Sequence, residues 1–101
     1  MKILTYDEAR NNPAWDNDTS RTNPKLVDGA TVKLRTASVV HFSRFSALVD
    51  AGAQGVVIHA RTPRVYGPGV YFANVDITID GQTGRARVPH NALTIIKGGQ
   101  S

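Results

Sequence analysis

Among the residues of this chain, three histidines could serve in the largest number of catalytic and metal-binding roles. His41, His59 and His90 are separated by 18 and 31 positions, and none has a companion at the short spacing that metal sites use. A zinc ion would need further ligands such as Asp50 or Asp76. Cysteine is absent, which excludes thiolate ligands, thiolate nucleophiles and disulfides. We therefore expect no metal site.

Nucleophilic and phosphate-transfer chemistry also lacks a matching pattern. The serines have no histidine at a fixed spacing. The glycine-rich stretch Gly67-Pro68-Gly69 is not followed by Lys-Ser/Thr and does not lead into a helix. The sequence therefore predicts a non-enzymatic protein that uses no cofactor and has no evident small-molecule substrate.

Basic side chains are the next candidates for function, and their distribution is uneven. Residues 29–101 contain eight Lys and Arg against three Asp, whereas residues 1–28 contain four against five Asp and Glu. If the two strands that carry most of them are neighbours, they form one basic surface. Its predicted members are Lys33, Arg35, Arg61, Arg64, Arg85 and Arg87. Such a surface attracts phosphates or an acidic protein, and solubility alone is the alternative.

Three aromatic residues are the predicted apolar part of a binding surface. Trp15 lies in a polar run and either pins that run onto the domain or anchors a partner. Tyr66 lies in the loop over residues 61–69, whose prolines and glycines cannot extend a sheet. Phe72 interrupts an alternating strand, so that either a bulge shifts the register or Phe72 covers a second surface.

The elements that must position these residues follow from pattern and punctuation. Thr5 and Glu8 have the spacing of a capping box, which predicts a helix of one or two turns from Tyr6. Alternation or apolar runs predict strands over 31–35, 56–60, 70–79, 85–88 and 93–97. Between the first two, Phe42, Phe45, Leu48 and Val49 recur at helical spacing, which predicts a short helix or turn within 42–50.

The closing stretch resembles the end of an SH3-like barrel. Gly84-Arg-Ala-Arg-Val-Pro89-His-Asn91-Ala92-Leu93 looks like the point where such a barrel leaves its distal hairpin, makes one 3₁₀ turn and adds a last strand. The resemblance implies a mainly β fold with one five-stranded barrel over residues 26–97. Outside this range, the polar run before Pro24 predicts an N-terminal arm over 1–25, and we expect a flexible tail over 98–101.

The same resemblance argues against a groove for proline-rich peptides. Peptide-binding SH3 domains have a Trp opening the third strand and a Tyr after Pro-x-Asn. This chain has Gly69 and Val70 at the first place and Ala92 at the second, and the superfold hosts many unrelated functions.

Three functions remain open from the sequence. The favoured one is a small protein-binding or inhibitor protein, for instance one encoded by a phage or mobile element, that meets an acidic partner. The second is a nucleic-acid-binding barrel of the KOW or Tudor kind that contacts phosphates. The third is a structural subunit of a virion or larger assembly. No stretch has the length and apolarity of a signal peptide or membrane span, so we expect a cytoplasmic protein.

Overall fold

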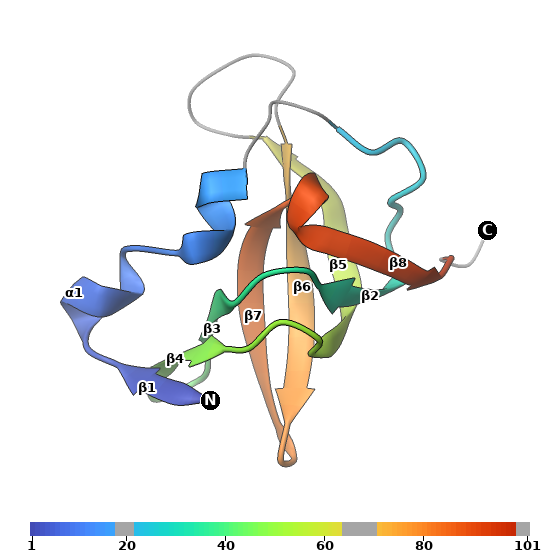
Figure 1. Cartoon of the computed structure of the whole chain (residues 1–101). Coiled ribbons are helices and arrows are strands. Elements are labelled where there is room, and N and C mark those ends of the chain that lie inside the picture. The colour runs from blue at the N-terminus through green and yellow to red at the C-terminus, as the bar shows by residue number, and fades with distance from the viewer. Residues whose placement is uncertain (18–21, 64–70, 99–101) are drawn as a thin grey trace.

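A computed structural model describes residues 1–17, 22–63 and 71–98 of the chain. Eight strands form one antiparallel sheet in the order β1-β4-β3-β7-β6-β5-β2-β8. Their bounds are β1 Lys2–Leu4, β2 Thr31–Leu34, β3 Ser38–His41, β4 Ser46–Val49, β5 Gln54–Pro63, β6 Tyr71–Ile79, β7 Gln82–Pro89 and β8 Leu93–Lys97. The sheet is curled, and β2 and β8 run across the direction of the long strands β5, β6 and β7 (Figure 1).

The mainly β character predicted from the sequence is confirmed, but the five-stranded barrel is not. The sheet has eight strands and is not closed, because β1 and β8 lie at its two ends. The additional strands, β1, β3 and β4, come from segments that the sequence did not predict as strands. Residues 38–49 add the hairpin of β3 and β4 beside β7, and β1 then pairs with β4.

The short helix or turn predicted within residues 42–50 is a turn and not a helix, because β3 and β4 meet there in a tight hairpin. Phe42 donates its amide to the Phe45 carbonyl oxygen at 2.8 Å, and the two rings stack with centroids 4.9 Å apart. Ala47 and Val49 on β4 are buried at alternating positions. The spacing of the aromatic pair therefore fits the two ends of a hairpin turn as well as one helical turn.

The alternation of β6 and β7 supplies five fully buried residues of the core. Asp80 and Gly81 form the turn between these strands with positive φ of 51° and 79°, as a two-residue hairpin requires. The inward residues of both strands are fully buried, and they are Ala73, Val75, Ile77, Ala86 and Val88. Because one face is buried in this way, the opposite face of β7 carries its arginines outward.

Two short helices lie between β1 and β2 along the chain. The predicted capping box is present: Thr5 accepts the Glu8 amide at 3.2 Å and donates its own amide to Glu8 at 3.1 Å, and α1 runs over Tyr6–Ala9. A 3₁₀ helix, η1, follows over Pro13–Asn17, and a second, η2, over His90–Ala92 forms the predicted turn before β8.

Among the described residues, no helix has the length and apolar character needed to cross a membrane.

Candidate functional site

An open cleft lies between the N-terminal helices and the β1, β4, β3 and β7 part of the sheet. Its volume is about 770 Å³, which lies within the range of about 300–1,000 Å³ that is typical of ligand sites. The described residues that line it are Leu4, Thr5, Tyr6, Ala9, Arg10, Asn12, Trp15, Val39, His41, Ser46 and Arg87. Segments far apart in the sequence thus meet around one hollow.

Two exposed aromatic side chains line this cleft. Tyr6 on α1 is 81% exposed and Trp15 on η1 is 46% exposed. Trp15 also donates its indole N–H to the Arg87 carbonyl oxygen at 3.0 Å, and its ring lies 5.6 Å from the Phe72 ring. Both alternatives for Trp15 are therefore compatible with the structure, since it pins η1 onto the sheet and still exposes nearly half of its surface.

Asn12 fixes η1 against the sheet and so shapes the cleft. Its side-chain oxygen accepts the amides of Ala14 at 3.1 Å and Val39 at 3.3 Å, and its side-chain nitrogen donates to the Arg87 carbonyl oxygen at 3.4 Å. Because these bonds reach both β3 and β7, the position of η1 does not depend on Trp15 alone.

Side chains that face one another across β1, β4 and β3 form the wall of the cleft opposite α1 and η1. Leu4 pairs with Ser46, and Ser46 pairs with His41, which places the three side chains on the same face of neighbouring strands. His41 Nδ1 lies 2.7 Å from Ser46 Oγ. The His–Ser contact is an exposed cross-strand pair.

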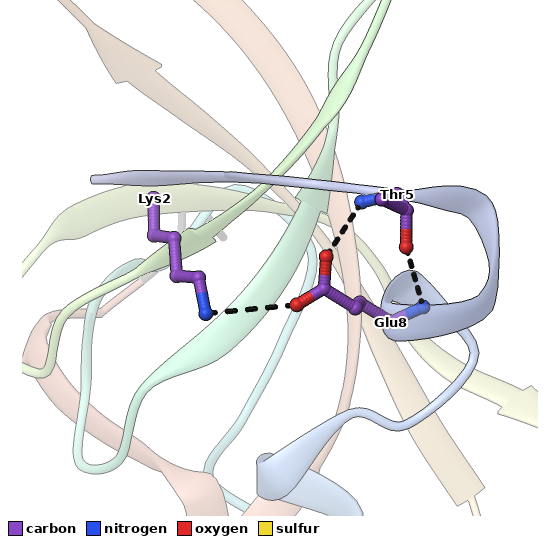
Figure 2. Close-up of polar contacts among 3 residues, drawn as sticks. All are labelled: Lys2, Thr5 and Glu8. Atoms are coloured by element: carbon purple, nitrogen blue, oxygen red, sulfur yellow. Dashed lines mark hydrogen bonds and ion pairs between the residues drawn. The ribbon is translucent and has the colours of Figure 1, made fainter.

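The C-cap of α1 places Arg10 on the cleft, whereas Glu8 of the helix lies on another side. Tyr6, Ala9 and Arg10 line the cleft, and their i, i+3, i+4 spacing places them on one side of the turn. Glu8 instead lies 3.6 Å from Lys2 on β1 and bonds the Thr5 amide (Figure 2). The Thr5 amide, with its hydroxyl and the Lys2 charge, holds the pKa of Glu8 below its usual value.

The described lining of the cleft is basic. It includes Arg10 and Arg87 and no Asp or Glu. The Arg87 guanidinium lies over the Phe72 ring, 5.4 Å from its centroid, a cation–π arrangement that fixes the direction of the side chain. Asp16 lines an adjoining hollow of about 240 Å³ together with Arg10, so the nearest carboxylate along η1 lies to one side.

The structure does not bring the predicted basic residues into one stripe. Lys33 is exposed on β2 and Arg85 and Arg87 lie on β7, with β5 and β6 between these strands. The sequence predicted one basic surface only if the two strands that carry most of these residues were neighbours. They are not neighbours in the sheet.

Several of these arginines contact acceptors within the chain. Arg85 forms an ion pair with Asp76 at 3.1 Å. Arg35, just after β2, donates to the Asn91 carbonyl oxygen at 3.4 Å, and Arg61 on β5 donates to the Pro24 carbonyl oxygen at 3.3 Å. These contacts hold the side chains against β6, η2 and the segment before β2.

The predicted aromatic residues are placed differently from one another. Trp15 lines the cleft, whereas Phe72 is 4% exposed and lies beneath Trp15 and Arg87. Phe72 thus covers a second surface of β6, and the β5–β6 register also shifts between His59 and Thr62, opposite Asn74 and Phe72, so both alternatives that the sequence left open are present. Arg64 and Tyr66 lie outside the described residues.

Tyr6 and Arg10 were missed by the sequence reasoning. Their signal was available, because the capping box fixes where the helix begins and Tyr6, Ala9 and Arg10 then share a side. The partner surfaces on β3 and β7 had no such signal, since they meet α1 only through the sheet order.

No group of three or more His, Asp or Glu within the described ranges is arranged to hold a metal ion.

Comparison with protein-family models, with curated proteins and with solved structures finds no match to this chain.

Proposed function

We propose that this protein is a non-enzymatic protein-binding module whose partner enters the cleft between α1, η1 and the sheet. One observation carries the proposal: two aromatic side chains, Tyr6 and Trp15, are exposed on a cleft of about 770 Å³ that a hydrogen-bonded scaffold holds open. Aromatic residues and Arg are the side chains that most often anchor a protein partner.

The size and chemistry of the cleft support this reading. A hollow of this volume suits a short segment of a partner rather than a flat domain surface. Tyr and Trp lose few rotamers when they bind, so an aromatic pair costs little conformational entropy. Arg10 adds a charge that selects among partners.

Nucleic-acid binding receives less support from the described residues. A phosphate-binding surface tracks a backbone with several basic groups, but the arginines of β7 and the basic residues of β2 lie on strands that β5 and β6 separate. Nucleic acid is therefore an outcome that the experiment must be able to detect.

The test is affinity capture from nuclease-treated host extract with three forms of the protein: wild type, Tyr6→Ala and Ile96→Ala. Ile96 on β8 is 48% exposed and lies at the other end of the sheet, so it controls for loss of an exposed apolar side chain. We expect one stoichiometric protein that wild type and Ile96→Ala retain and Tyr6→Ala loses.

Equal capture by all three forms would show that the cleft is not the binding site. Capture that disappears with nuclease treatment would favour nucleic acid instead.

A further inference from the structure

We infer that the cleft is built for an extended acidic segment with an aromatic side chain, whose ring contacts Tyr6 and Trp15 and whose carboxylate meets Arg10. This inference rests on the proposed function and specifies the chemistry of the partner. It is carried by the way α1 divides its charges between two sides, and by the pair of aromatic residues that flanks Arg10 in the sequence and in the cleft.

Glu8 is held on the side of α1 that faces β1. Its carboxylate bonds the Thr5 amide at 3.1 Å and lies 3.6 Å from Lys2 Nζ (Figure 2). Glu8 and Lys2 therefore neutralise each other on the β1 side of α1, and neither lines the cleft. The charge at the cleft is that of Arg10, the C-cap residue of α1, which an incoming carboxylate can approach without displacing the Lys2–Glu8 ion pair.

The aromatic side chains and Ala9 shape the same surface of the cleft. Ala9 lines the cleft with Tyr6 and Trp15, and its methyl group leaves room that a larger side chain would fill. One face of Trp15 packs against Phe72, while nearly half of its surface stays exposed. A ring bound here contacts aromatic faces or edges at the distances of 4.5–7 Å that such pairs favour.

The charge balance favours an acidic peptide over a nucleic-acid strand. A single carboxylate or a short acidic run needs one or two cations, which Arg10 and the rest of the lining supply. A strand of phosphates needs a longer positive groove, and Asp16 borders the neighbouring hollow. The acidic peptide is therefore the ligand class to test.

Trp15 makes the binding measurable, because it is the only tryptophan in the chain and it lines the cleft. The probes are three blocked hexapeptides: acetyl-DEFDED-amide, the same peptide with Ala in place of Phe, and the same peptide with Asn and Gln in place of Asp and Glu. An oligonucleotide of six thymidines is the fourth probe. Each is titrated against the full chain while Trp15 fluorescence is recorded.

The first peptide should bind at least about tenfold more tightly than either altered peptide or the oligonucleotide, since each change removes one anchoring contact. Arg10→Gln should weaken the first peptide by about threefold to tenfold and weaken the Asn/Gln peptide by less, since an amide oxygen still accepts a hydrogen bond from Arg10 but carries no charge. The matched control is Arg44→Gln, because Arg44 is exposed in the hairpin between β3 and β4 and does not line the cleft. It should have no effect on either peptide.

Two results would overturn the inference: equal affinity for the acidic and Asn/Gln peptides, or tighter binding of the oligonucleotide. The first would leave the proposed function intact if Tyr6→Ala still abolished capture of the partner protein. Loss of the Tyr6→Ala effect in the capture experiment would refute the proposed function itself, so the two failures are distinguishable.

Discussion

His90 shows how a single buried side chain ties three segments together. It is 2% exposed, and its Nδ1 accepts the Asn23 amide at 2.9 Å while Nε2 lies against the Ala60 carbonyl oxygen. A backbone amide can only donate and a carbonyl can only accept, so the ring is neutral with its proton on Nε2. Burial lowers the pKa of His90 from its ordinary value of 6.5, with the Arg61 charge acting in the same direction.

The sign of the pH effect follows from this lowered pKa. Below pH 6.5 the unfolded chain binds a proton on His90 that the folded chain resists, so the free energy of unfolding falls as the pH falls. We expect urea midpoints to decrease from pH 6.5 to about pH 5. His90→Gln should reduce that slope, whatever its effect on absolute stability. An unchanged slope would contradict the assignment of the effect to His90.

Trp15 also has a structural role, which measurements of unfolding can separate from its role in binding. Trp15→Ala removes the bond to the Arg87 carbonyl oxygen and the Phe72 contact, and should lower the free energy of unfolding by about 1–3 kcal/mol. Trp15→Phe keeps a ring and should cost about 1 kcal/mol. Chemical denaturation followed by circular dichroism measures both. Equal losses for the two variants would mean that the ring contact contributes nothing.

At the level of elements, one close approach joins the two parts of the sheet. A Cβ added to Gly84 on β7 would lie 2.6 Å from Val40 Cγ1, 2.8 Å from Phe42 Cδ1 and 3.0 Å from the His41 carbonyl oxygen. Only a residue without a side chain lets β3 lie this close to β7. Gly84 thereby positions the β3, β4 and β1 wall of the cleft.

Gly84→Ala should therefore destabilise the protein by about 1–3 kcal/mol through overpacking. The control is Gly98→Ala, because a Cβ there meets nothing within 4 Å, and its effect should stay within about 0.5 kcal/mol. Thermal or urea unfolding measures the difference. A Gly84→Ala protein as stable as the control would show that β3 and β7 can separate at no cost.

At the level of the whole molecule, the net charge of +4 affects the rate at which an acidic partner arrives. Raising the ionic strength from about 0.01 M to about 0.15 M shortens the screening length from about 30 Å to about 8 Å. We expect the association rate of acetyl-DEFDED-amide, measured by stopped-flow Trp15 fluorescence, to fall while the dissociation rate changes less. The Asn/Gln peptide is the control, and an equal salt effect on both would contradict electrostatic steering.

Local patterns in the sequence determined the elements whose signals lie within a few residues. The capping box of Thr5 and Glu8 and the turn over His90–Ala92 depend on contacts between near neighbours, and both are present. The β6 and β7 alternation likewise separated inward from outward residues, because side chains on a strand alternate between its two faces.

Tertiary structure alone decided which elements became neighbours. Phe42 and Phe45 suit either a helical turn or a hairpin, and pairing of β3 with both β4 and β7 selected the hairpin. The same pairing separated β2 from β7 and dispersed the predicted basic stripe. The sequence by itself determines side-chain chemistry and local geometry. The meeting of Tyr6, Trp15 and Arg87 depends instead on strand order. Strand order is set by the packing energy summed over the whole sheet.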